Sequence, residues 1–126
     1  MRLNKVWFFL IILCFSCKDP KLVRKNVTDG NINVKWYYYS YISNTGPDII
    51  EVKKKDSIVQ ILRADEIIVD VVIQDKKIII KTFENASPYI HSDSILTEVY
   101  GYKIVLDTTL PTHDKYHVPR NVTKEY

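Results

Sequence analysis

The chain of 126 residues contains only three glycines and two cysteines. Phosphate-cradling loops need closely spaced glycines, so this scarcity excludes a P-loop or a dinucleotide-binding loop, and no Gly-x-Ser-x-Gly pattern marks a hydrolase nucleophile. Beyond the N-terminal apolar run, no stretch repeats its apolar residues with the 3.6-residue period of a helix. We therefore expect a non-enzymatic protein built from strands, with no catalytic residues and no cofactor.

The only long apolar run lies at the N-terminus. Val6–Phe15 is ten residues long, whereas a membrane-spanning helix needs about 20. The basic residues Arg2 and Lys5 precede the run, and the small residue Ser16 follows it. This order is typical of a secretory signal peptide.

The residues after the apolar run resemble a bacterial lipobox. Cys14-Phe15-Ser16-Cys17 is similar to the loose form common in the phylum of Bacteroides and Flavobacterium, and Lys18-Asp19 resembles the surface-export signal of that phylum. Pro20 stands where a second acidic residue is usual. The resemblance implies cleavage before Cys17, lipidation of Cys17 with fatty acids such as palmitate, and an outer-membrane lipoprotein that faces either the periplasm or the surface.

Charge and cysteine content describe the mature chain further. Loss of Arg2 and Lys5 lowers Lys+Arg from 18 to 16 against 15 acidic residues, so the net charge falls from +3 to about +1 and gives no electrostatic case for nucleic-acid binding. Cys14 would leave with the signal and Cys17 would carry lipid, which leaves no thiol for a disulfide or a metal. We expect a signal peptide over 1–16, a tether over 17–33, a domain over 34–110 and a polar tail over 111–126.

Short β-branched runs separated by charged turns dominate the domain. Isoleucine and valine favour extended backbone, and aspartate, serine and lysine between such runs favour turns. The predicted strands are Val34–Ile42, Ile49–Val52, Ser57–Leu62, Ile67–Ile73, Ile78–Phe83, Ile95–Tyr100 and Tyr102–Thr109. The predicted fold is all-β: a small antiparallel sandwich or partly closed barrel of about six to eight strands.

Two hairpins have a predicted register. Pairing Ile73 with Ile78 sets Asp70 opposite Lys81, a favourable cross-strand charge pair, and Val69 opposite Thr82. In the second hairpin, Val52 pairs with Val59 and Glu51 with Gln60, so Ile50, Val52, Val59 and Ile61 form the core side.

The aromatic strand contains the candidate binding surface. If Ile42 pairs with Ile49, then Tyr37, Tyr39 and Tyr41 face the core and Trp36 and Tyr38 face outward. An exposed Trp–Tyr stripe is suited to contacts with a protein or a sugar ring. The alternative is that a second sheet or the tether covers Trp36 and Tyr38.

Candidate reactive groups are few. His113 and His117 have the spacing of helical metal ligands, but Pro111 and Pro119 bracket them, so we expect no metal site. An enzyme would require His91 and His113 to converge with acids in a pocket. The acidic pair Asp65-Glu66 has the composition of a solvated turn.

Three tripeptides resemble the Asp-Ser/Thr-aliphatic acceptor of protein O-glycosylation in the same bacterial phylum. They place candidate modification sites at Ser57, Ser94 and Thr108. The alternative is that Asp-Ser is simply how these strands begin.

The sequence thus predicts a lipid-anchored outer-membrane lipoprotein that works as a binding or structural module, with the membrane as one partner and a protein or glycan as another. Two more specific functions stay open. One is an envelope protein that neutralises a toxin or hydrolase, and the other is a glycan-contacting accessory protein.

Overall fold

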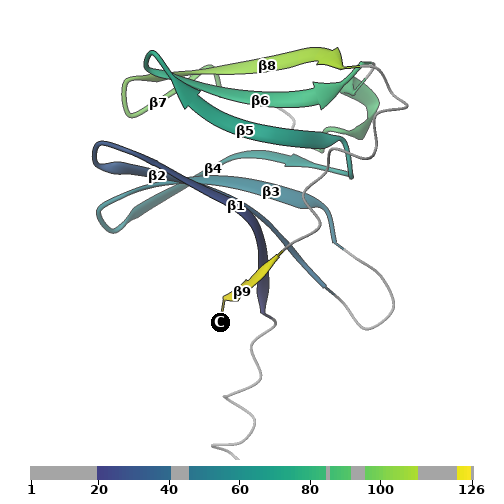
Figure 1. Cartoon of the computed structure of the whole chain (residues 1–126), viewed down its shortest axis with the longest axis horizontal. Coiled ribbons are helices and arrows are strands. Elements are labelled where there is room, and N and C mark those ends of the chain that lie inside the picture. Colours follow the sequence, from purple (N-terminus) through teal and green to yellow (C-terminus); the bar gives the residue numbers. More distant parts are fainter. Residues whose placement is uncertain (1–19, 41–45, 85, 92–95, 111–121, 126) are drawn as a thin grey trace, which may run out of the picture.

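A computed structural model describes residues 20–40, 46–84, 86–91, 96–110 and 122–125 (Figure 1). Strands dominate these residues, and one short 3-10 helix, Ser87–Tyr89, accompanies them. The strands are β1 (Lys21–Asp29), β2 (Ile32–Tyr39), β3 (Asp48–Lys54), β4 (Ser57–Ala64), β5 (Ile68–Gln74), β6 (Lys77–Phe83), β7 (Glu98–Val99), β8 (Tyr102–Leu110) and β9 (Thr123–Glu125).

The strands form two sheets packed face to face, so the predicted all-β sandwich is confirmed. One sheet has five strands in the order β4-β3-β2-β1-β9, and the other has four in the order β5-β6-β8-β7. The four-stranded sheet is mixed, because β6 and β8 run parallel. The segment between them returns to the starting end of β6 before β8 begins, and the short hairpin β7–β8 then closes that edge (Figure 1).

The predicted domain boundaries are wrong at both ends. Residues 21–33, assigned to a tether, form β1 and the start of β2, which pair around the turn at Gly30. Within the predicted polar tail, β9 pairs with the first three residues of β1. The described residues form nine strands rather than the six to eight predicted, because β1 and β9 also join the five-stranded sheet. Only three of the nine residues of β1, Leu22, Val23 and Val27, are aliphatic, which is why this segment resembled a tether.

The predicted register of the β5–β6 hairpin is confirmed near its turn. Ile73 pairs with Ile78 and Asp70 with Lys81. The two turn residues have positive φ, as a two-residue type I′ hairpin turn requires. The predicted pairing of Val69 is wrong, because the register shifts there and Ile68 lies opposite Thr82.

In the β3–β4 hairpin, Val52 pairs with Val59 and Glu51 with Gln60, as predicted. The register then shifts, so that Ile50 faces Leu62 rather than Ile61. A bulge places two residues of one strand against one of the other. Three of the four predicted core residues are buried, and Val59 is half-buried.

The predicted register of the aromatic strand is wrong. β2 ends at Tyr39, and Trp36 pairs with Ile50 while Tyr37 pairs with Ile49. The tight turn at Gly30 sets where β2 begins, and the long connection after β2 leaves room for this register. Tyr41 and Ile42, used for the prediction, lie outside the described residues.

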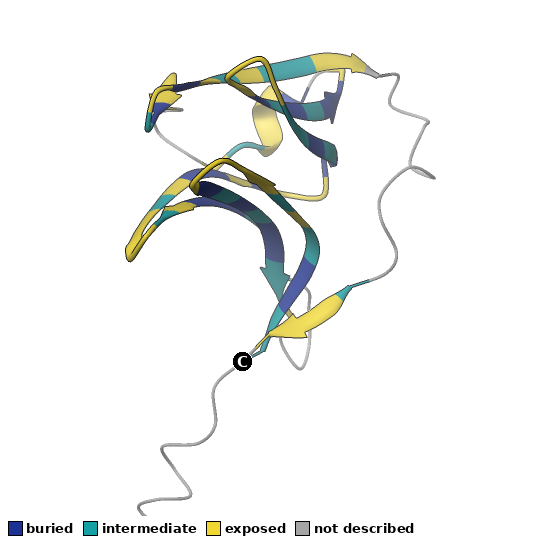
Figure 2. Cartoon of the chain, turned by 60° about the vertical axis from the view of Figure 1, so that its left-hand side comes forward, coloured by how far each residue is buried: buried dark blue, intermediate teal, exposed yellow. Residues whose placement is uncertain are grey.

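The core lies between the sheets, and both open sides of the sandwich carry links. On one side Lys25 of β1 binds Asp70 of β5 at 2.6 Å. On the other, the segment around Ile90 pairs with the end of β4 at Ala64. Figure 2 shows buried residues along the strands of both sheets and exposed residues at the turns and on β9. The largest fully buried side chains are Trp36, Ile32, Ile50, Leu62, Ile68, Ile78 and Ile80.

Candidate functional site

The predicted aromatic binding stripe belongs to the inner face of the five-stranded sheet. Trp36 is 0% exposed, so its prediction as a surface residue is wrong. Tyr38 is half-buried, and the Arg24 guanidinium lies 4.3 Å from its ring centroid. Because side chains alternate along a strand, the changed register of β2 turned both residues inward together.

Arg24 and Asp48 form a buried ion pair beside these aromatic rings. Arg24 Nε donates to Asp48 Oδ1 at 3.0 Å, and the two side chains are 13% and 3% exposed. Burial raises the pKa of Asp48, whereas Arg24 opposes that rise by stabilising the carboxylate. The Trp36 indole also favours the carboxylate, but its Nε1 has no partner of hydrogen-bond geometry among the described residues. The cluster ties β1 to β3 across β2.

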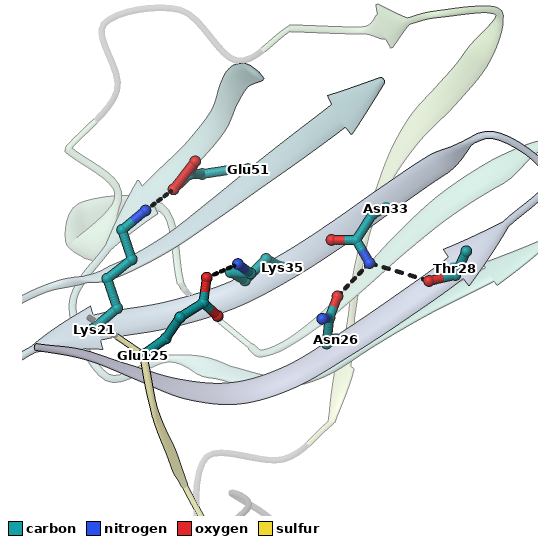
Figure 3. A network of polar contacts seen from close by, with 7 residues as sticks. All are labelled: Lys21, Asn26, Thr28, Asn33, Lys35, Glu51 and Glu125. Atoms are coloured by element: carbon teal, nitrogen blue, oxygen red, sulfur yellow. Dashed lines mark hydrogen bonds and ion pairs between the residues drawn. The ribbon is translucent and has the colours of Figure 1, made fainter. Parts of the chain in front are cut away.

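The outer face of the five-stranded sheet carries a network of polar contacts (Figure 3). Lys21 binds Glu51 at 3.2 Å, and Lys35 of β2 binds Glu125 of β9 at 2.5 Å. Further along β1 and β2, Asn33 donates to Asn26 and Thr28. These contacts hold β9 and the two long strands together through their side chains.

Tyr37 lies on this outer face but is 5% exposed. The ammonium of Lys21 lies 4.6 Å from its ring centroid, and Tyr39 packs against it edge to face at 5.6 Å. Burial raises the pKa of the Tyr37 hydroxyl, and its hydrogen bond with Glu51 raises it further. The face is therefore internally satisfied, with its acids bound to lysines and a tyrosine rather than presented to a ligand.

The outer face of the four-stranded sheet differs, because it carries an aliphatic row. Val72 pairs with Ile79, and Ile79 with Val105, so the three side chains lie side by side on β5, β6 and β8. Val72 and Ile79 are half-buried, and Val105 is 37% exposed. We call these three residues the aliphatic row.

Polar rows flank the aliphatic row. On one side Asp70, Lys81 and Asp107 alternate in sign across the three strands. On the other side, Gln74, Lys77 and Lys103 form a second polar row across the same three strands. An apolar centre with a polar rim is the composition of a protein-contact surface. Sequence reasoning missed it because it depends on β6 and β8 being parallel neighbours, and because Val105 lies in an unbroken aliphatic run with Ile104 and Leu106 that does not mark one residue as outward-facing.

The structure describes two of the three predicted O-glycosylation sites. Ser57 and Thr108 are exposed, and Ser57 Oγ lies 2.6 Å from the Tyr100 hydroxyl, within hydrogen-bond distance. Ser94 and the predicted lipidation site Cys17 lie outside the described residues. The two described residues lie at the start of β4 and near the end of β8.

The described histidine has an ordinary surface contact. His91 Nε2 lies 2.8 Å from Asp65 Oδ1, and both side chains are about half exposed. His113 and His117 lie outside the described residues. Over the described ranges, no group of three His, Cys, Asp or Glu side chains could hold a metal ion. No helix in the same ranges is long and apolar enough to cross a membrane.

Comparison with known proteins adds no relative: no family model, curated protein sequence or solved structure matches this chain.

Proposed function

We propose that this chain is a small lipid-anchored lipoprotein of the outer membrane that works as a non-enzymatic binding module. The position of β1 determines what a lipid at Cys17 would do. Its first residue, Lys21, comes four residues after Cys17, so lipid on Cys17 would hold the folded sandwich directly at the membrane. The basic, apolar and small-residue order before Cys17 supports the same attachment.

The binding surface we propose is the outer face of the four-stranded sheet, with the aliphatic row at its centre. This sheet lies on the opposite side of the molecule from the start of β1 and from β9 (Figure 1). An anchor at Cys17 would therefore leave the aliphatic row accessible to a protein partner. The alternative of glycan stacking relied on Trp36 and Tyr38; Trp36 is 0% exposed, which leaves only the half-buried Tyr38 for contact with a sugar ring and makes this alternative less favourable.

Replacing the lipidated residue tests the anchor. Cys17→Ala should move the protein from the membrane fraction to the soluble fraction and abolish the acyl mass on the N-terminal peptide. Cys14→Ala is the matched control and should change neither readout, because Cys14 belongs to the predicted signal peptide. Unchanged membrane association and unchanged peptide mass in Cys17→Ala would exclude lipidation at this residue.

Site-specific cross-linking in cells tests the binding face. A photo-crosslinking residue in place of Val105 should capture a discrete partner, whereas the same residue in place of Ile58, which is 55% exposed on β4, should not. Ile79→Lys should remove the adduct at position 105, because a charge in the middle of an apolar contact loses the desolvation gain. Equal adducts at both positions, or an adduct that survives Ile79→Lys, would contradict this assignment.

A further inference from the structure

We propose that the β1–β9 end of the sandwich, with Tyr38 and Tyr39 at its rim, is a membrane-contacting surface that lies against the phospholipid headgroups. The inference rests on the proposed lipid anchor at Cys17 and goes beyond it, because it assigns an orientation and names the contacting residues.

The covalent geometry limits how far this end of the sandwich can stand from the lipid. Lys21, the first residue of β1, is four residues beyond Cys17, and a fully extended chain spans at most about 3.6 Å per residue. The Cα of Lys21 therefore lies within about 14 Å of the acylated residue, whatever conformation the intervening residues adopt. This short link holds the end of the sandwich that carries Lys21 close to the membrane surface, within reach of the phospholipid headgroups.

The strand register decides which residues share that end. Lys21 pairs with Tyr39 of β2 and with Glu125 of β9. The next residue of β1, Leu22, pairs with Tyr38 and with Lys124. Two tyrosines and two lysines thus sit in the two rows nearest the anchor, and Figure 1 places the start of β1 next to β9.

The chemistry of these side chains suits a headgroup layer. Tyrosine has an apolar ring and a polar tip, and it is enriched at membrane–water interfaces. Tyr38 and Tyr39 are partly exposed and lie on opposite faces of β2, Tyr38 on the inner face beside Arg24 and Tyr39 on the outer face beside Tyr37. Lysine can lay its methylene stem on the apolar surface while its ammonium stays with phosphate groups, and Lys124 is exposed for such a contact.

Depth-dependent quenching on the full acylated protein tests this orientation. The mature chain has no thiol other than the acylated Cys17, so one added cysteine can carry a fluorophore selectively. Lys124→Cys on β9 and Lys103→Cys on β8 form a matched pair, because both replace an exposed lysine on a strand. The proteins are reconstituted in phosphatidylethanolamine–phosphatidylglycerol vesicles that contain a headgroup-nitroxide lipid.

We expect strong quenching of the fluorophore at position 124 and almost no quenching of the fluorophore at position 103. In the position-124 protein, Tyr39→Ser should weaken quenching, whereas Tyr89→Ser, at a tyrosine that is 51% exposed elsewhere, should not. Equal quenching at the two positions, stronger quenching at 103, or no effect of Tyr39→Ser would overturn the proposed contact. The mass of the N-terminal peptide separates two failures. Acylated protein without the quenching difference rejects only the orientation, and protein without lipid rejects the anchor and the orientation together.

Discussion

Removing one member of the buried Arg24–Asp48 pair should destabilise the sandwich strongly. In Asp48→Ala, the Arg24 guanidinium stays among buried groups without its carboxylate, since only 13% of its side chain is exposed. Breaking a buried ion pair in this way costs about 3–5 kcal/mol of unfolding free energy. Because the Tyr38 ring still contacts the Arg24 guanidinium, we expect a loss at the lower end of this range, about 3 kcal/mol. For a domain of this size, that loss lowers Tm by about 12–24 °C.

The double variant Arg24→Met with Asp48→Leu should behave differently. Both charges are then gone, and apolar side chains of similar volume fill the space, which is often neutral or stabilising for buried pairs. We therefore expect a coupling free energy of about 2 kcal/mol or more in the double-mutant cycle. The more accessible pair Lys25–Asp70 is the control, because its side chains are 34% and 35% exposed and its removal should cost less than about 1 kcal/mol.

The assay is urea unfolding followed by tryptophan fluorescence. Trp36 is the one tryptophan that remains after loss of the predicted signal, and it lies next to the cluster, with the Arg24 guanidinium 5.8 Å from its ring centroid. A loss below about 1 kcal/mol in Asp48→Ala, or a double variant no more stable than the single one, would refute the reasoning, since surface pairs behave that way.

The pH dependence gives an independent check on Asp48. Its folded-state pKa is raised above the ordinary value of 3.8, chiefly by burial. Between the unfolded and folded pKa values the folded state binds more protons, so this carboxyl makes stability fall as pH rises through that window. Asp48→Asn should remove this contribution and leave a profile that no longer falls there.

Three further outcomes follow from the same contacts. Lys81→Glu should cost about 0.4–2 kcal/mol in urea unfolding, because it sets like charges against both Asp70 and Asp107, each worth about 0.2–1 kcal/mol. Lys35→Ala should lower the amide protection factors in β9. Acid should lower them in the wild type too, once the exchange rates are corrected for their intrinsic pH dependence, because the hydrogen bond from Lys35 lowers the pKa of Glu125 and this stabilisation is lost as pH falls. Gly101→Ala should lower the unfolding free energy by about 1–2 kcal/mol, because Gly101 has φ of +83° and an L side chain is strained there.

The sequence by itself determined the all-β class and the local hairpins. In β5–β6 and β3–β4, short turns join β-branched strands, and one opposite-charge pair, Asp70 and Lys81, lies at the predicted position. A short loop allows few strand registers, and a slip of one residue would turn the core face to solvent. The local sequence pattern was therefore sufficient to predict the register near each turn. The bulges further from the turns, at Val69 and beside Ile61, leave no mark in a pattern of aliphatic residues.

Only the tertiary structure decided which faces are buried and which strands are neighbours. The side of β2 that carries Trp36 was settled by its turn with β1, a segment whose polar residues read as a tether. β9 joined the sheet through Lys35 and backbone pairing with β1, more than 90 positions away in the sequence. The parallel contact of β6 with β8, which creates the aliphatic row, depends on the path of the segment between them. Such pairings between distant residues depend on total burial in the sandwich, and no local window of sequence contains that information.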